Sequence, residues 1–527
     1  MDCLSHLLAI VGLLVLVVLY NFHRIRSNSN KSKTSEAPEP SGAWPILGHL
    51  HLLGGDLPVA RTLGAMADKY GPVYSLRLGS NPAIVVSSWE AVKDCFTTND
   101  TIFATRPTMA VGKYLGYDHS VFALAPYGPY WRDVRKMVTL ELLTNHRLEK
   151  LKHVRSSEID YCIQDLYSVC LNNGDNPSTV VINKWFEHLT FNISLRMLVG
   201  KRFSASTCSE SNTEGWHVKE AIKKALYLSG VFVVSDAIPW LEWMDIGGHV
   251  KGMKQTAKEL DVIIGNWLEE HIQKRKESCT IQERDFMDVM LSTLADDTVM
   301  SGHKRDTIIK GTTMILILTG SESTAETLTW ALSLLLNNRH VLKKVQDELD
   351  VHIGKDKLVE ESDIKNLPYL QAIIKETLRL YPPGPVAGPR EALEDCYIDG
   401  YYVPKGTRLI VNLWKLHRDA RVWTNPDQFQ PERFLTTHAN VNVKGQHHEY
   451  IPFSSGRRMC PGVTFGLQVV HLVLARLLQG FDIITPMNKP VDMKEGLGIA
   501  LPKISPLEVI LKPRLPSELY QNFEAQA

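Results

Sequence analysis

Most of the chain beyond residue 45 repeats apolar residues three and four positions apart, with charged residues between them. This spacing places the apolar side chains on one face and predicts amphipathic α-helices, most clearly over residues 146–170, 250–277, 340–353 and 369–381. Residues 73–88 alternate instead and predict a β-hairpin that turns at Ser80-Asn81-Pro82. Residues 399–412 predict another pair of strands. The pattern therefore indicates a mainly α-helical fold with small β-sheets.

The segment from Met314 to Leu336 has apolar ends and a polar middle, Thr-Gly-Ser-Glu-Ser-Thr at residues 319–324. It resembles a membrane span, but a carboxylate at the centre of a bilayer costs at least about 2.5 kcal/mol. We therefore predict a buried helix in the protein core. Its polar middle has two interpretations: a notch of small residues that lets another helix approach closely, or a reactive site.

The N-terminus predicts a membrane anchor. Residues 7–20 are continuously apolar and, with their apolar neighbours, approach the roughly 20 residues that span a bilayer. Five basic residues follow at positions 23–33, while only Asp2 precedes, so the bulk of the chain is expected in the cytosol. A cleaved signal peptide is the alternative, although no basic segment precedes the run and no small-x-small cleavage site follows it. We expect the anchor over residues 1–26, a polar linker containing proline over 27–45, and one domain over 46–527.

Composition excludes some classes of protein. Lysine and arginine total 58, as do aspartate and glutamate, so no overall positive charge points to nucleic acid. The eight cysteines are scattered and contain no CxxC pair, which argues against a disulfide scaffold or a structural zinc site. Most are expected to be reduced and buried.

Cys460 has unusual neighbours in the stretch "PFSSGRRMCPG", residues 452–462. Gly456 and Gly462 would let the backbone approach a bound group, and Arg458 could pair with an anion. An apolar helical run follows, and the start of a helix favours a negative ligand. Cys460 is therefore a candidate thiolate ligand for haem iron, and a buried, unreactive thiol is the alternative.

The stretch resembles the haem-binding signature of the cytochromes P450, Phe-x-x-Gly-x-Arg-x-Cys-x-Gly. Further landmarks of that family occur in the expected order: "WRDVRK", "TGSEST", "KETLR" and "PERF". The resemblance covers essentially the whole chain and implies a cytochrome P450 fold that binds haem b. It assigns the signature positions to cofactor binding, with Cys460 as the axial ligand of the iron: Phe453, Gly456, Arg458, Cys460 and Gly462.

The resemblance also implies roles for the other landmarks. Glu376 and Arg379 would form a buried charge network with Arg433, which fixes geometry more than it adds stability. Trp131, Arg135, Arg458 and Arg390 would meet the haem propionates, because arginine can donate two hydrogen bonds to a carboxylate.

Glu322, Ser323 and Thr324 occupy the positions that deliver protons to oxygen in the family. The common form of that motif has Asp-Thr where this chain has Glu322-Ser323. The hydroxyl is kept, but the methyl group that restricts its rotamer is lost. We therefore expect proton delivery with less firmly fixed geometry.

Several stretches, such as "GAWPILGHLHLL" and "VDMKEGLGIALPK", resemble plant microsomal cytochromes P450, in the group that includes nicotine N-demethylase and flavone, alkaloid and terpenoid hydroxylases. The resemblance implies an NADPH- and O2-dependent monooxygenase of the endoplasmic reticulum membrane. It would hydroxylate or demethylate a lipophilic alkaloid, flavonoid or terpenoid, with electrons from NADPH–cytochrome P450 reductase. A reductase-independent rearrangement or dehydration enzyme and a non-catalytic haem protein are the alternatives. Residues 228–243 are apolar enough to enter the membrane surface or to pack in the core.

Overall fold

The computed structural model describes residues 35–172, 179–204, 213–277 and 284–521, together with Gly12 and Val15. The predicted anchor otherwise lies outside the described residues. The α-helices are α2 (Leu50–Leu53), α3 (Val59–Tyr70), α4 (Trp89–Phe96), α5 (Pro129–Met137), α6 (Asn145–Lys150), α7 (Lys152–Asn172), α8 (Ile182–Val199), α10 (Glu214–Gly230), α11 (Val234–Ala237), α12 (His249–Glu277), α13 (Phe286–Thr293), α14 (Arg305–Asn337), α15 (Arg339–His352), α16 (Pro368–Leu380), α17 (Leu413–Leu416), α18 (Val463–Gly480) and α19 (Glu518–Gln521).

Short 3-10 and π turns connect many of these helices. The 3-10 turns are η1 (Ile102–Ala104), η4 (Pro239–Met244), η5 (Glu361–Asn366), η6 (Pro431–Phe434), η7 (Gly456–Arg458) and η8 (Pro486–Asn488), and the π turns are η2 (Val111–Leu115) and η3 (Val138–Leu142).

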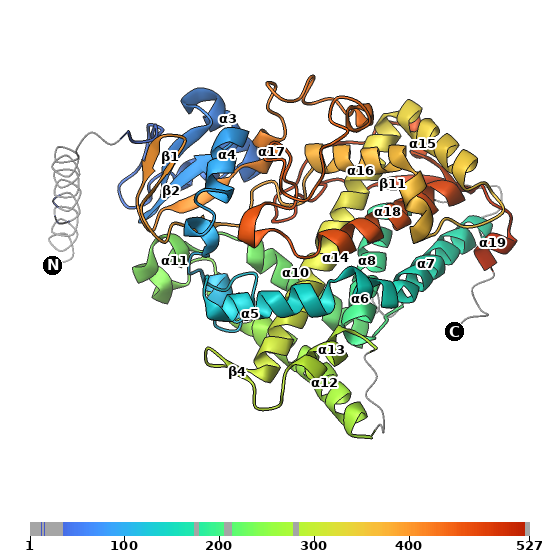
Figure 1. Ribbon diagram of the computed structural model, residues 1–527, viewed down its shortest axis with the longest axis horizontal. Coiled ribbons are helices and arrows are strands. Elements are labelled where there is room, and N and C mark those ends of the chain that lie inside the picture. The colour runs from blue at the N-terminus through green and yellow to red at the C-terminus, as the bar shows by residue number, and fades with distance from the viewer. Residues whose placement is uncertain are drawn as a thin grey trace, which may run out of the picture.

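Four small sheets accompany the helices. The largest has the order β1 (Val73–Leu78), β2 (Asn81–Val86), β9 (Arg408–Val411) and β6 (Arg390–Glu391), with β2 and β9 parallel. The second has the order β10 (Phe481–Ile484), β11 (Glu508–Pro513) and β3 (Thr179–Val181), and two hairpins pair β4 (Val299–Met300) with β5 (His303–Lys304) and β7 (Cys396–Ile398) with β8 (Tyr401–Val403). The largest sheet and α3 form one end of the molecule, and long helices form the rest (Figure 1).

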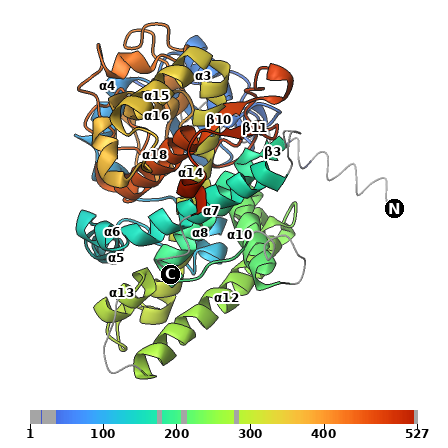
Figure 2. The ribbon, with the colours of Figure 1, turned by 90° about the vertical axis from the view of Figure 1, so that its right-hand side faces the viewer.

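Helix α14 runs through the middle of the molecule, between the layer of α15, α16 and α18 and the layer of α10, α12 and α13 (Figure 2). Most of its residues are buried on all sides, as expected of an apolar core helix. The predicted core helix is therefore confirmed, and it begins at Arg305, nine residues before Met314. Helix α8 packs along it, and a Cβ on Gly320 would lie 3.3 Å from Ser194 Oγ. Gly320 thus serves close helix packing.

The two strand predictions had different outcomes. The first hairpin is confirmed, but Leu78 pairs with Asn81, so its turn is Gly79-Ser80. Gly79 has a φ of 65°, which a glycine adopts without strain. The predicted pairing within residues 399–412 is wrong. Strand β8 turns back at Gly400 onto β7, whereas β9 joins β2 and β6 in the largest sheet.

Helix α18 is the one helix of the described residues long and apolar enough to cross a membrane, and 61% of it is buried inside the protein. It packs against α14, α15 and α16, so it is a core helix.

The described part of the predicted linker lies along the first strand. Ser75 N donates to Pro38 O at 2.8 Å, and Arg77 Nε donates to Glu39 Oε1 at 3.0 Å.

Candidate active site

Cys460 lies in a tight loop three residues before the start of α18, as the sequence predicts. Its backbone N–H donates to Phe453 O at 3.0 Å, and Met459 N donates to Gly456 O at 3.0 Å. Arg135 on α5 donates from Nη2 to Met459 O at 2.5 Å. These bonds fix the direction of the loop and place the positive charge of α5 beside it.

Cys460 keeps accessible surface, yet burial is the largest influence on the pKa of its thiol and raises it. A residue that is accessible but surrounded by many protein atoms faces a space inside the protein. The backbone N–H of Gly462 and the charge of Arg135 act in the opposite direction and lower this pKa. A bound metal ion would shift the balance further toward the thiolate. The other described cysteines are Cys95, Cys162 and Cys396, which are buried, and Cys170, which is half-buried; all are unpaired.

Positive charge is concentrated beside this loop. Burial, together with repulsion by Arg106, Arg390 and Arg135, lowers the pKa of Arg458 to about 8. Burial likewise lowers the pKa of Arg390 to about 9 and that of Arg106 to about 10. Because a guanidinium keeps its proton in proteins, these shifts show that three positive charges are held at buried positions.

Arg458 joins the loop to a segment far away in sequence. It donates to Ala104 O and to Ala125 O, both at 2.6 Å, and its guanidinium lies 4.3 Å from the centre of the Trp131 ring. Arg106 donates to Pro389 O at 2.6 Å. Arg106 is a site residue that sequence reasoning missed, since no motif marks it.

Asp100 is the one carboxylate that approaches this positive group among the ion pairs of the described ranges. It lies 3.8 Å from Arg390 Nη1 and 2.7 Å from Arg457 Nη1. Arg390 also donates to Ser455 O at 2.8 Å, while its Nη1 has no hydrogen-bond partner in the described part of the chain. Asp100 therefore pairs with Arg390 and Arg457, while Arg106, Arg135 and Arg458 form no ion pair in the described ranges.

The two glycines of the motif, Gly456 and Gly462, lie next to different groups. A Cβ on Gly456 would lie 2.1 Å from Asp100 Oδ1, so Gly456 makes room for this carboxylate. A Cβ on Gly462 would lie 3.9 Å from Cys460 Sγ. That either glycine also lets the backbone approach a bound group stays a prediction.

The polar middle of α14 lies close to the same loop. A Cβ on Gly320 would lie 3.8 Å from Phe465, in the first turn of α18. Thr319 and Ser323, one turn apart, keep accessible surface although the helix is buried around them. The hydroxyls of Thr319, Ser323 and Thr324 each donate to the carbonyl four residues earlier at 2.7 Å. These bonds hold each hydroxyl in one orientation.

Two acids, Glu322 and Glu326, lie one turn apart on α14. Burial and the nearby Glu187 raise the pKa of Glu322, although Lys223 lowers it. Burial, Glu322 and Glu187 raise the pKa of Glu326 to about 9. Glu326 Oε2 has no hydrogen-bond partner among the described residues. Sequence reasoning missed Glu326, although its position one turn after Glu322 in an apolar helix was visible.

The predicted charge network is present and buried. Arg379 donates to both carboxylate oxygens of Glu376, at 2.8 and 2.9 Å, and Arg433 Nε donates to the same carboxylate at 3.0 Å. Arg379 also donates to His417 O at 2.8 Å and to Pro426 O at 2.7 Å. Glu376 and Arg379 have no exposed surface, so the interpretation as a solvated surface pair is wrong.

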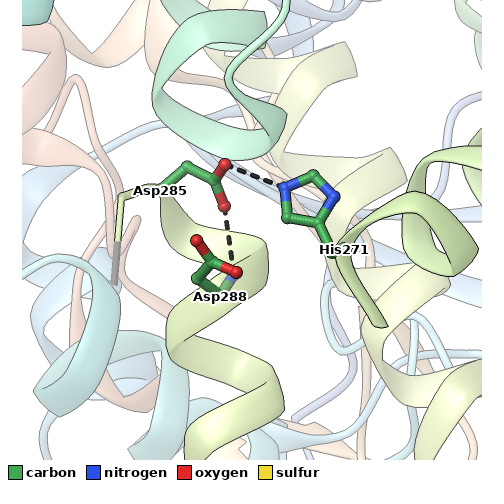
Figure 3. A group of neighbouring side chains, drawn as sticks. All are labelled: His271, Asp285 and Asp288. Atoms are coloured by element: carbon green, nitrogen blue, oxygen red, sulfur yellow. Dashed lines mark hydrogen bonds and ion pairs between the residues drawn. The ribbon is translucent and has the colours of Figure 1, made fainter. Parts of the chain in front are cut away.

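A second group of titratable residues lies elsewhere, between α12 and α13 (Figure 3). His271 Nδ1 lies 2.6 Å from Trp267 O, and Nε2 lies 2.9 Å from Asp285 Oδ2. Both neighbours are acceptors, so both ring nitrogens donate and His271 is protonated. Asp285 also accepts from Asp288 N at 3.0 Å at the start of α13. This group is a buried ion pair with a helix cap.

The residues around Cys460 fit haem. An accessible thiol inside the protein can ligate iron, and four arginines with one carboxylate can bind a group that carries two carboxylates. The profile of the family described as Cytochrome P450 matches residues 38–509 of this chain.

Relatives and a solved structure agree with this profile. Xanthotoxin 5-hydroxylase of Arabidopsis thaliana is 53% identical over 97% of this chain and 99% of that protein. Vinorine hydroxylase of Rauvolfia serpentina is 48% identical over 99% of this chain and 100% of that protein, and nicotine N-demethylase of Nicotiana tomentosiformis is 47% identical over 97% and 99%. A zebra fish cytochrome P450 structure with progesterone has a TM-score of 0.74 at 24% identity, covering 87% of this chain and 100% of that chain.

The chain belongs to the cytochrome P450 family, and the predicted fold is confirmed. Membership defines a haem-thiolate monooxygenase that takes electrons from NADPH through a reductase and acts on a lipophilic substrate.

Proposed function

We propose that this chain hydroxylates, or oxidatively demethylates, a lipophilic polycyclic plant metabolite in the space between Cys460 and the polar middle of α14. The observation that carries the proposal is that Cys460 keeps accessible surface beside Arg135 and Arg458, neither of which forms an ion pair among the described residues. Phe465, in the first turn of α18 after this loop, lies beside Gly320 of α14, which supports placing the thiol and the hydroxyls of α14 around one space.

Each cofactor residue has a distinct task in this proposal. Cys460 would ligate the haem iron, and Phe453 and Gly462 shape its loop. Trp131, Arg135, Arg458 and Arg390, with Arg106 added, would hold the propionates of haem, and Glu376, Arg379 and Arg433 would fix the surrounding backbone. When bound, the haem iron supplies the activation of molecular oxygen.

Ser323, Thr324 and Glu322 would supply protons on the opposite side. Ser323 has accessible surface, and its hydroxyl can accept a proton from one neighbour while it donates to another. Glu326, with a pKa of about 9, holds a proton at neutral pH one turn from Glu322. We assign it as the acid that returns a proton to Glu322.

The apolar surface near α11 supports a location at a membrane. Trp240 and Trp243 in η4 are 64% and 80% exposed, and Phe232 is 54% exposed. Tryptophan is typical of the membrane–water interface. The same segment bonds to the first sheet, since Ser80 Oγ donates to Ala237 O at 2.8 Å. The described chain begins along this sheet, so an anchor at the N-terminus would hold η4 near the bilayer of the endoplasmic reticulum, with the domain in the cytosol.

Yeast microsomes that carry this chain and a reductase test the proposal. We expect a reduced, CO-bound absorption band at about 450 nm, which Cys460→Ser abolishes. Xanthotoxin, vinorine and nicotine are the first substrates to supply, because relatives are named for them. Flavonoids and terpenoids complete the panel. A normal band without an oxygen-dependent product from any class would contradict the proposed substrate class, and a missing band would contradict the role of Cys460.

A further inference from the structure

An open groove of about 750 Å³ lies between η4 and the start of α12, outside the active site. Two kinds of side chain line it. Trp240 and Trp243 come from η4, and three lysines come from α12: Lys251, Lys254 and Lys258. The lysines are three and four residues apart, so they share one face of the helix. All three are exposed.

The acids of the groove already have partners. Asp245 accepts from Val250 N at 2.8 Å and from Lys251 N at 2.9 Å, and so caps the first turn of α12. Glu242 pairs with Lys113 at 3.0 Å and accepts from the hydroxyl of Tyr114.

The lysines lack such partners. No ion pair within 4 Å in the described ranges includes Lys251 or Lys258, and Lys254 lies 4.5 Å from the centre of the Tyr114 ring. The groove therefore offers positive charge to a ligand that is not part of the chain.

The surroundings indicate the chemistry of this ligand. Next to the lysines stand the exposed side chains of Trp240, Trp243 and Met244, and Ile246 follows them at 48% exposure. A soluble anion would use the lysines and leave this apolar surface in water. A phospholipid uses both, because its phosphate meets the cations while its acyl chains meet the apolar residues.

We propose that this groove binds the headgroup of an anionic phospholipid, held by Lys251 and Lys258 beside Trp240 and Trp243. The proposal rests on the membrane location argued above. The bound lipid would orient the domain with η4 against the bilayer, and an uncharged headgroup would bind more weakly.

The test uses the full, haem-loaded chain in nanodiscs of phosphatidylcholine with a varied share of phosphatidylserine whose acyl chain carries bromine. Bromine quenches the fluorescence of nearby tryptophan. We compare the share of brominated lipid in the bilayer at which quenching reaches half of its maximum. We expect this share to be about thirtyfold lower for brominated phosphatidylserine than for brominated phosphatidylcholine, because two lysines are attracted to an anionic surface. The K251Q/K258Q double variant should lose this preference.

The matched control is K274Q/K276Q, which removes two exposed lysines from the far end of the same helix. It should keep the preference. Equal quenching by both brominated lipids, or equal losses in the two double variants, would overturn the proposal. Abolition of the preference by free glycerophosphoserine would also overturn it, because the site would then recognise a soluble phosphate.

The CO-bound spectrum and product formation are measured on the same samples, so failure of the proposed function is seen separately. Quenching by neither lipid would contradict the membrane location itself.

Discussion

Ser323 is the residue at which this chain departs most clearly from the common motif of its family. Its hydroxyl donates to Thr319 O at 2.7 Å and keeps accessible surface. We expect Ser323→Ala to lower product per NADPH consumed by about tenfold, with a matching rise in peroxide, because one hydrogen bond contributes about 1.4 kcal/mol. Product, NADPH and peroxide are measured together in microsomes.

Two further variants separate catalysis from helix packing. Ser323→Thr restores the missing methyl group and should raise coupling above that of the natural chain. Ser333→Ala removes a similar bond in the same helix, from Ser333 Oγ to Thr329 O at 2.7 Å, in a fully buried position. It should leave coupling unchanged. An unchanged product ratio in Ser323→Ala would contradict the role of this hydroxyl.

Residues with fixed spacing were predictable from the sequence, and residues joined only by folding were not. Cys460 and Gly462 belong to one short motif and are neighbours in the structure, since a Cβ on Gly462 would lie 3.9 Å from Cys460 Sγ. Arg106 approaches the loop only because it donates to Pro389, 283 residues away. Gly456 makes room for Asp100, which is also far away in the sequence. Spacing carries no information about such pairs.

Helix α16 and the turn η6 are joined by the buried carboxylate of Glu376. Glu376→Gln would leave Arg379 and Arg433 without their shared counterion, and breaking a buried pair costs about 3–5 kcal/mol. We expect most of the variant to lack the band at about 450 nm and to unfold at lower temperature. Glu432→Gln is the control in the same turn. Its half-exposed ion pair with Lys344, at 3.0 Å, should contribute less than about 1 kcal/mol. Equal losses in both variants would contradict the special role of the network.

The link between α12 and α13 should make stability depend on pH. Burial lowers the pKa of His271, but the hydrogen bond and charge of Asp285, the bond to Trp267 O and the charge of Asp288 outweigh burial and raise it. A raised pKa means that His271 contributes stability fully below its unfolded pKa of about 6.5, and that this contribution is lost as the pH rises through the folded value.

His271→Gln should therefore cost about 2 kcal/mol at pH 6, and the cost should shrink toward pH 9. Thermal unfolding of both proteins across this range measures the difference. The exposed His352, at the end of α15, provides the control His352→Gln, which should unfold like the natural chain throughout. A constant difference across the range would show that His271 acts without titration.

Elements were easier to predict than their partners. The amphipathic helices and the first hairpin follow from local spacing, because the pattern of apolar residues is set by the element itself. Strand β9 illustrates the limit. Its pairing with β2 joins residues 408–411 to residues 83–86, and nothing in the local pattern distinguishes this partner from β8. Pro404 and Gly406 lie between β8 and β9, and the chain leaves one sheet there and joins another.

The whole molecule assembles its active site from four segments that carry like charge. Arg106 follows η1, Arg135 lies on α5, Arg390 begins β6 and Arg458 precedes α18. Burial is the main cause of their lowered pKa values, and repulsion by other arginines adds to it at Arg458 and Arg390. Among the ion pairs of the described residues, only Asp100 offsets this charge, at Arg390. A ligand with two carboxylates would bind the folded chain and stabilise this arrangement by mass action. Haem should therefore order these segments through its propionates as well as through its iron.

Chain produced without haem should be cut by trypsin between residues 105 and 136, where Arg132 is exposed, and haem should protect this region. Haem dimethyl ester keeps the iron but lacks the two charges. We expect it to need about a hundredfold higher concentration for the same protection, because two charge-assisted hydrogen bonds contribute about 3 kcal/mol together. Cleavage at Lys343, on the distant α15, is the internal control and should not respond to either compound. Equal protection by haem and by its ester would mean that ligation by Cys460 alone orders the site, and that the arginines serve the fold without binding the cofactor.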